Sequence, residues 1–126
     1  MLKQENITPV LVIIYCCIIF SVSSIPGTDL PELPATDYIM HGIEYAGLGF
    51  LLAWWRKSRG ESVKKLLMFS LAAASIYGIT DEVHQYFVPG RFMSLTDWIA
   101  DTIGAMAGIA IFLVLHGVSE KNLTRK

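Results

Sequence analysis

Most side chains that could do chemistry in this chain lie between Ile79 and Asp101. This segment reads ITDEVHQYFVPGRFMSLTDWIAD and concentrates carboxylate, imidazole, amide and guanidinium groups between two apolar stretches. Carboxylates beside a histidine suit general acid–base catalysis or the binding of a cation. An arginine suits bidentate recognition of a phosphate or a carboxylate. The groups in question are Asp81, Glu82, His84, Gln85, Arg91, Asp97 and Asp101.

A plainer interpretation is that residues 88–90, Val-Pro-Gly, form only a turn between two helices with solvated ends. A turn explains the proline and the glycine, but it does not explain four acidic residues in register on the flanking helices. The flanking stretches, residues 66–79 and 103–115, have the composition of membrane-embedded helix. An ionisable group at membrane depth costs about 3 kcal/mol or more, so we expect these groups to have a function.

A second polar group opens the apolar stretch that begins near Asp37. With about 100° per residue in a helix, Asp37, His41 and Glu44 fall within a narrow arc, and Tyr45 lies at its edge. His41 fits a structural hydrogen bond as well as it fits catalysis. The helix dipole alone explains acids at helix starts, such as Asp37 and Asp97. It does not explain acids deeper in a helix or near a helix C-terminus, which are Glu44, Asp81, Glu82 and Asp101.

Four apolar stretches must position these residues. Hydrophobic residues make up 53% of the 126-residue chain, which predicts an all-α membrane protein with one domain, a bundle of four transmembrane helices. We expect helices over residues 8–25, 37–55, 66–87 and 95–115. The third must continue through residues 81–85, because its apolar part alone is short for a membrane about 30 Å thick. The first stretch also resembles a cleaved signal peptide, but three further spans favour an uncleaved helix.

The connections and helix faces give further expectations. The proline-rich connection over residues 26–35 predicts an extended, stiff link without helix. Gly104 and Gly108 continue the helix face of Asp97 and Asp101, and this small-residue pattern predicts that the face points into the bundle. His84 is rotated about 60° from Asp81 on the helix, so we expect it to face lipid headgroups.

Basic residues predict the orientation in the membrane. Of the ten lysines and arginines, five lie within residues 56–65 and three after residue 120, whereas the loops after the first and third helices carry only Arg91. The positive-inside rule then places both termini and the middle loop in the cytoplasm. Every acid, histidine and glutamine named above as a candidate then falls at the extracytoplasmic end of its helix. We therefore expect a multi-pass protein of the cell membrane whose site faces the extracytoplasmic side.

Charge balance restricts what the site can hold. Six carboxylates face only Arg91 and His41, and in a low-dielectric pocket they cannot all stay ionised without help. Some acids stay protonated, a divalent cation binds, or a cationic group of a substrate enters. Oxygen-rich sites suit Mg²⁺, Ca²⁺ or Mn²⁺, and an added histidine extends the range to Zn²⁺, so the cofactor stays unassigned. A net charge of −1 without a basic stripe argues against a nucleic-acid partner.

These residues, in this order, resemble the VanZ-like family of small membrane proteins. The pattern is Asp37-x-x-x-His41-x-x-x-Tyr45, Asp81-Glu82-x-x-Gln85, Pro89-Gly90-Arg91 and Asp97-x-x-x-Asp101-x-x-Gly104. The resemblance covers residues 37–115, and the combined motif is specific although each piece is weak. The chain departs from the family at Tyr38, where lysine is frequent, and at Asp101, where asparagine is frequent. Each departure makes the site more acidic, and that at Asp101 weakens a direct transfer of mechanism.

The resemblance implies a role in the cell envelope and, for the founding member, lowered sensitivity to the glycopeptide teicoplanin. It implies no established reaction. Two functions stay open: an enzyme acting on a membrane lipid or lipid-linked envelope precursor, and a non-catalytic protein that binds such a lipid or the antibiotic. For catalysis we select His41, Asp81, Glu82 and Asp97, with His41 and one of the acids exchanging a proton. For binding we select Asp37, Tyr45, Gln85, Arg91 and Asp101, with Arg91 holding an anionic headgroup.

Overall fold

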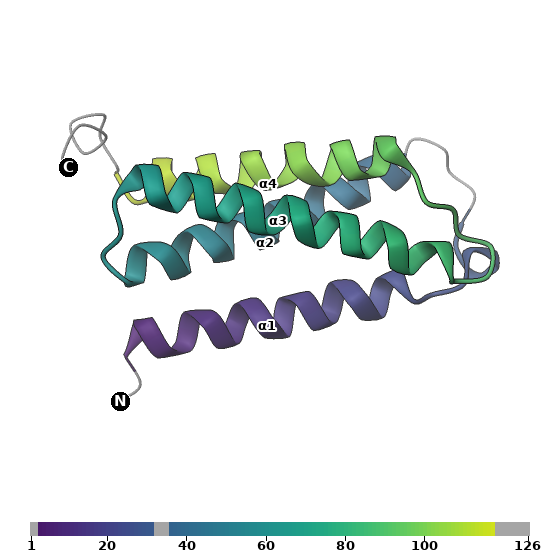
Figure 1. Ribbon diagram of the computed structural model, residues 1–126, viewed down its shortest axis with the longest axis horizontal. Helices are drawn as coiled ribbons and strands as arrows, with labels where there is room; N and C mark the ends of the chain where they lie inside the picture. Colours follow the sequence, from purple (N-terminus) through teal and green to yellow (C-terminus); the bar gives the residue numbers. More distant parts are fainter. Residues whose placement is uncertain (1–2, 32–35, 118–126) are drawn as a thin grey trace.

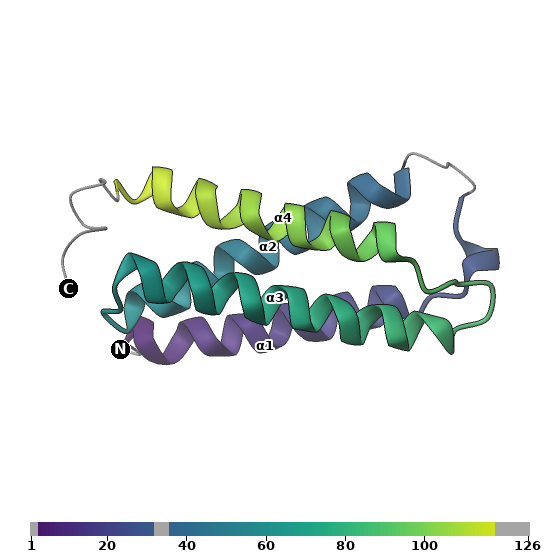
Figure 2. The ribbon, with the colours of Figure 1, turned by 45° about the horizontal axis from the view of Figure 1, so that its top comes forward.

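The chain folds into four helices that run up and down along one axis. A computed structural model describes residues 3–31 and 36–117. The helices are α1 (Gln4–Ser23), α2 (Thr36–Ser58), α3 (Val63–Tyr86) and α4 (Leu95–Leu115), with a short 3₁₀ helix, η1 (Gly27–Asp29). In Figures 1 and 2, α1 begins and α4 ends at one end of the bundle. We call this the basic end, since it carries the α2–α3 loop; the opposite end, with η1 and the α3–α4 loop, is the polar end.

The four predicted helices are confirmed as helices, and the differences lie at their ends. The largest is at α1, which begins at residue 4 rather than 8, because the polar first turn gives no hydrophobic signal although Glu5 suits a helix start. Helix α3 begins at Val63, where the Ser62 side chain accepts the backbone N–H of Lys65 at 3.4 Å. It continues through Gln85 as predicted.

The α2–α4 contact is the most extensive between any two helices of the described chain. A Cβ atom at Gly104 would collide with the carbonyl oxygen of Gly42, and a Cβ atom at Gly108 with that of Ala46. Glycine allows the two backbones to approach this closely, so these positions fix how α4 lies on α2. The prediction that the Gly104 and Gly108 face points into the bundle is confirmed.

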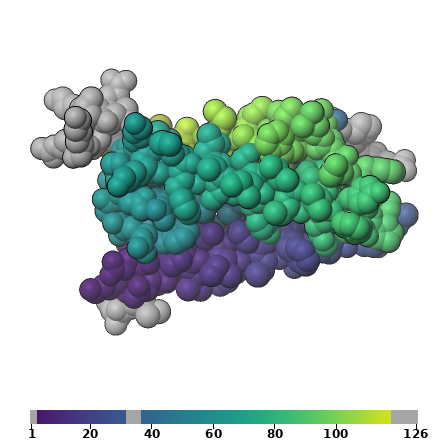
Figure 3. Space-filling view, viewed as in Figure 1, coloured from purple at the N-terminus to yellow at the C-terminus, as the bar shows by residue number. Residues whose placement is uncertain are grey.

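Two tyrosines attach α1 to the rest of the bundle. The Tyr15 hydroxyl donates to the backbone carbonyl of Glu44 on α2 at 2.8 Å. The Tyr77 hydroxyl of α3 donates to the backbone carbonyl of Cys16 at 2.6 Å. Figure 3 shows α1 lying along α3 on the face in view, with α4 on the other side of α3. Helix α1 therefore covers the side of α2 and α3 that α4 leaves open.

Three helices of the described chain, α1, α3 and α4, are long and apolar enough to cross a membrane. Helix α2 has 23 residues but does not belong to this set. Its ends are polar, with Asp37 in the first turn and Arg56 and Lys57 in the last. The protein is therefore an α-helical membrane protein by the composition of three helices, and the fourth span stays a prediction.

The connection after α1 differs from the extended link that the prolines predict. Residues 27–29 form the 3₁₀ helix η1 directly after Pro26. Proline restricts its own φ and the residue before it, so a proline-free triplet can still form one turn. Residues 32–35, including Pro34, lie outside the described chain. Gly27 donates its N–H to the carbonyl of Pro89 at 2.9 Å, which joins η1 to the α3–α4 loop.

Candidate functional site

Three helices bring their polar turns together at the polar end. The first two turns of α2 supply His41, the last turns of α3 supply Asp81, Glu82 and Gln85, and the first two turns of α4 supply Asp97 and Asp101. The antiparallel order places a helix start, a helix end and a second helix start at one level. All of these side chains are buried except Asp97, which is partly buried.

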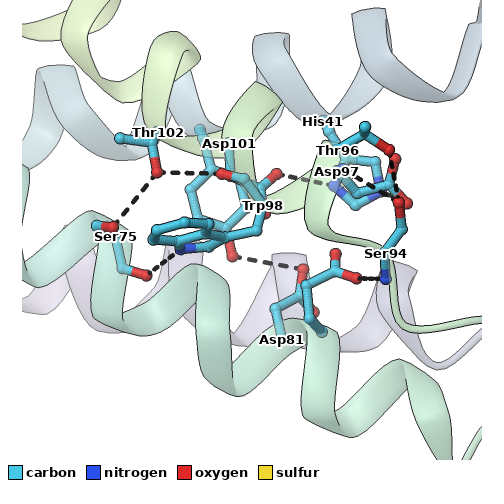
Figure 4. Close-up of polar contacts among 11 residues, drawn as sticks. His41, Ser75, Asp81, Ser94, Thr96, Asp97, Trp98, Asp101 and Thr102 are labelled. Atoms are coloured by element: carbon cyan, nitrogen blue, oxygen red, sulfur yellow. Dashed lines mark hydrogen bonds and ion pairs between the residues drawn. The ribbon is translucent and has the colours of Figure 1, made fainter.

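His41 lies at the centre of this group, between α2 and α4 (Figure 4). Its Nδ1 lies 2.8 Å from Asp101 Oδ1, and the Nδ1–H donates to this fully buried carboxylate. Its Nε2 lies 3.9 Å from Asp97 Oδ2, beyond hydrogen-bond distance. Asp101 therefore fixes the ring, and Nε2 is the nitrogen left for chemistry.

Asp81 and Asp101 form the buried floor of the site. The Tyr45 hydroxyl points at Asp81 Oδ2 from 3.4 Å, a long hydrogen bond. Asp101 Oδ2 is buried, and no group of the described chain donates to it. One ligand atom each from His41, Asp81 and Asp101 lies within 4.8 Å of the others. Two carboxylates this close favour the uptake of a proton or a cation between them.

Glu82 connects the end of α3 to the start of α4. Its Oε2 accepts the backbone N–H of Ser94 at 2.8 Å, and the Ser94 hydroxyl accepts the backbone N–H of Asp97 at 3.4 Å. Ser94 thus caps the start of α4 while its own N–H is held by Glu82. The other oxygen, Glu82 Oε1, is buried without a hydrogen-bond partner among the described residues. Glu82 therefore helps to place Asp97 beside His41 and keeps one oxygen free.

A cavity of about 420 Å³ opens beside these groups. Acidic, amide and guanidinium side chains line it together with η1 and the α3–α4 loop; the polar members include Asp37, His41, Gln85, Arg91, Ser94 and Asp97. A second cavity of about 200 Å³ shares six of its lining residues and extends past Glu44 toward α1. We call the first the polar cavity. Its volume is in the range of small-molecule sites.

Arg91 contributes the cationic group of the polar cavity. Its side chain is partly buried, and it forms no ion pair with any carboxylate of the described chain. Its Nε is buried and has no hydrogen-bond partner in the same residues. The loop that carries it is fixed by the bond from Gly27 to Pro89 and by Gly90, whose φ of 73° favours glycine. A fixed guanidinium with unused donors is suited to an anion.

The structure brings eight of the nine selected residues to the cavity or to the buried group beneath it; Tyr45, the ninth, is fully buried and reaches the group through its hydroxyl. Asp37 lies exposed at the rim. His84, which we expected to face lipid headgroups, is partly exposed and contacts α1: its Nε2 lies 2.9 Å from Ser24 Oγ, and its ring stacks on that of Phe20 with 4.3 Å between the ring centroids. The position of α1 decides this contact, and the helix rotation used for the prediction carries no information on α1.

Sequence reasoning missed the apolar wall of the cavity. Gly27, Leu30 and Pro31 line it. The connection that holds them carries no imidazole, amide or cationic side chain that would have marked it as part of a site. The proline density was the available signal, because a stiff connection is suited to forming a wall.

Helix-dipole complementation alone does not explain the acidic cluster, since Asp81 and Glu82 lie near a helix C-terminus, where an acid is unfavourable.

Comparison with known proteins gives one match. A model of the VanZ/LLP1 family covers residues 8–116, which includes most of α1, all of α2, α3 and α4, and every site residue. No curated protein and no solved structure matches the chain. The match confirms the resemblance drawn from the four motifs and extends it through α1. The chain belongs to the VanZ/LLP1 family.

Proposed function

We propose that this single membrane domain binds the phosphate-bearing headgroup of a membrane lipid or lipid-linked envelope precursor at the extracytoplasmic face. The chain crosses the membrane four times, with both termini and the α2–α3 loop in the cytoplasm. The distribution of basic residues supports this orientation. Helix α2 contacts each of the other three helices, so its His41 and Tyr45 are shielded from lipid and the helix need not be as apolar as its neighbours.

One observation carries the proposal: Arg91 lies in the polar cavity without a carboxylate partner in the described chain. An arginine that served only as a counter-ion would be paired with one of the many acids nearby. A partly buried guanidinium with unused donors is instead suited to bidentate binding of a phosphate. Gln85, buried at the same wall, offers an amide for a second hydrogen bond.

An apolar cavity supports a lipid rather than a soluble phosphate. It measures about 220 Å³ and lies between α3 and α4, lined by Ile79, Val83, Met93, Leu95 and Trp98 together with Glu82 and Ser94. Ser94 also lines the polar cavity. An amphiphile could therefore place its headgroup beside Arg91 and its chain along the α3–α4 face. Withdrawal of a wall precursor in this way would change susceptibility to teicoplanin, as the resemblance implies.

The His41–Asp101 pair favours a second candidate function, an enzyme acting on the same lipid. A carboxylate that holds Nδ1–H leaves Nε2 as a general base, an arrangement common to many hydrolases. Glu82 and Asp97 each offer an oxygen within 4.8 Å of a ring nitrogen of His41, a distance over which one water molecule can relay a proton. The enzyme forms product from the bound lipid, whereas the binder only retains it.

Lipid binding by the purified chain tests the proposal. We expect mass spectrometry to find phosphate-bearing lipids that copurify with the protein, and nanodisc binding to favour polyprenyl phosphate over the matching polyprenol at least about tenfold. Arg91→Ala should lose this preference for the phosphate. Arg59→Ala serves as its matched control, because Arg59 is exposed in the loop that we place in the cytoplasm. Equal binding of the alcohol and the phosphate would contradict the proposal. Product formation during incubation would select the enzyme over the binder.

A further inference from the structure

We propose that His41, Glu82 and Asp97 bind a divalent metal cation at the inner wall of the polar cavity. One ligand atom from each residue lies within 4.8 Å of the other two. The three residues come from α2, α3 and α4, so the site joins the three helices of the polar end. One imidazole nitrogen with two carboxylate oxygens suits Zn²⁺ or Mn²⁺. Three protein ligands leave at least one coordination position open toward the cavity.

The orientation of His41 is the first argument. Asp101 holds Nδ1 at 2.8 Å, which leaves the lone pair of Nε2 free near Asp97. A carboxylate behind a histidine fixes the tautomer and orientation that a metal requires. The 3.9 Å between Nε2 and Asp97 Oδ2 is too long for a hydrogen bond. It suits two ligands of one ion, since bonds of about 2.1 Å each allow a separation of up to about 4.2 Å.

The free oxygen of Glu82 is the second, independent argument. The residue is 4% exposed, and its Oε2 is engaged by the Ser94 N–H. Its Oε1 is buried and receives no hydrogen bond from the described chain. A buried carboxylate oxygen without a partner is destabilising, and a bound cation removes that cost. An acidic cluster whose members merely cap helices would not leave such an oxygen inside the protein.

The neighbouring group of His41, Asp81 and Asp101 is the less suitable alternative. All three residues are buried, and Asp101 Oδ2 also lacks a partner among the described residues. A cation bound to Nδ1 there would have to displace the 2.8 Å hydrogen bond to Asp101. Of these three residues only His41 lines the polar cavity, whereas both His41 and Asp97 of the proposed site line it. We therefore assign Asp101 as a positioning residue behind His41.

A cation also resolves a conflict in the proposed function. The acids of the polar cavity repel a phosphate, and Arg91 alone cannot compensate for them. A divalent ion held by carboxylates commonly completes its coordination with phosphate oxygens. This bridging role rests on the proposed function, whereas the cation site itself does not.

Mn²⁺ titration of the full-length chain in detergent tests the site without any lipid. We expect one saturable Mn²⁺ per chain, seen by electron paramagnetic resonance and displaced by Zn²⁺. Glu82→Gln and Asp97→Asn are nearly isosteric and should each weaken binding at least about tenfold, as should His41→Ala. Asp29→Asn removes an exposed acid from the same end of the bundle and should leave the affinity unchanged. Thermal unfolding and size-exclusion profiles establish that each variant is folded.

Folded wild-type protein that binds neither ion saturably would overturn the cation site, and so would equal affinities in Asp97→Asn and Asp29→Asn. The isosteric variants keep the test valid if His41→Ala lowers the folded yield. Lipid binding measured with and without a chelator separates the two proposals. Phosphate-selective binding that survives the chelator retains the proposed function and rejects the bridging role. Wild-type protein that shows neither saturable Mn²⁺ binding nor phosphate selectivity, without any chelator, would reject both.

Discussion

The two ends of the bundle differ in whether their charged side chains are paired. At the basic end, Arg56 forms a two-point pair with Glu61, with Nε donating to Oε2 at 2.8 Å, and its guanidinium lies 3.9 Å from the centroid of the Phe69 ring. At the polar end, Glu82, Arg91 and Asp101 each retain a buried charged atom without a partner in the described chain. Among the charged side chains of the described chain, every buried atom that lacks a hydrogen-bond partner lies at this end.

This difference indicates that the charges of the basic end contribute to stability, whereas those of the polar end lower it. A paired and partly exposed charge contributes modestly to stability, whereas a buried unpartnered one lowers it. Proteins tolerate such costs mainly at sites that act on a ligand. We therefore propose that a ligand completes the unpartnered groups of the polar end, whereas the paired charges of the basic end need none.

The largest expected effect concerns the side of the membrane on which each end lies. In a background without Cys16 and Cys17, we expect Phe92→Cys to react with a membrane-impermeant maleimide in intact cells, because Phe92 is 82% exposed in the α3–α4 loop, which the proposed topology places outside. Arg59→Cys at the basic end should react only after lysis. Reaction of Arg59→Cys in intact cells, with Phe92→Cys protected, would reverse the topology and move the site to the cytoplasmic side.

The next effect separates a structural from a ligand-binding role for Arg91. We expect Arg91→Ala to fold with normal yield and to lose about 100-fold in affinity for a phosphate-bearing lipid, which corresponds to about 3 kcal/mol for a buried charge-assisted contact. The measurements are folded yield and nanodisc binding.

The double variant Arg91→Ala/Glu82→Gln sharpens this result. A structural counter-ion would leave an orphaned carboxylate in Arg91→Ala, and Glu82→Gln would then restore the yield. We expect no restoration, because Glu82 already engages Ser94 and Arg91 pairs with no described carboxylate. Recovery of lipid binding in the double variant would contradict the role of Arg91 as an anion site.

Some features of these residues can be predicted from the sequence, and others depend on the three-dimensional packing of the helices. The convergence of three polar turns follows from helix length and the basic-residue asymmetry, and neither depends on side-chain detail. The packing face of Gly104 and Gly108 follows from their spacing alone. The bond from Glu82 to the Ser94 N–H and the choice of His41 Nδ1 for Asp101 depend on helix tilt and rotation. A periodic pattern does not encode those angles.

A moderate effect is expected at Asp101, where function and stability should change in opposite directions. Asp101→Asn replaces an unpartnered oxygen with an amide that can donate toward Asp81, while the remaining oxygen still accepts from His41. We expect the free energy of unfolding to rise by about 1 kcal/mol and Mn²⁺ affinity to fall about tenfold. Thermal unfolding and metal titration measure the two changes. A loss of stability would show that the buried acid is structural.

The smallest effect is expected at the basic end, where it tests the other half of the comparison. Arg56→Ala and Glu61→Gln should each lower the free energy of unfolding by about 1 kcal/mol or less, because their side chains are only partly buried and solvent screens the pair. Their double-mutant cycle should give a coupling of about 0.5 kcal/mol. Arg56→Ala should lower the free energy of unfolding more than Glu61→Gln does, since it also removes the stacking of the guanidinium on Phe69 and Trp55. Lipid and Mn²⁺ binding should stay at wild-type values in both. A change in ligand affinity from this distance would mean that the two ends are coupled, and the separation of a stabilising end from a ligand-binding end would then fail.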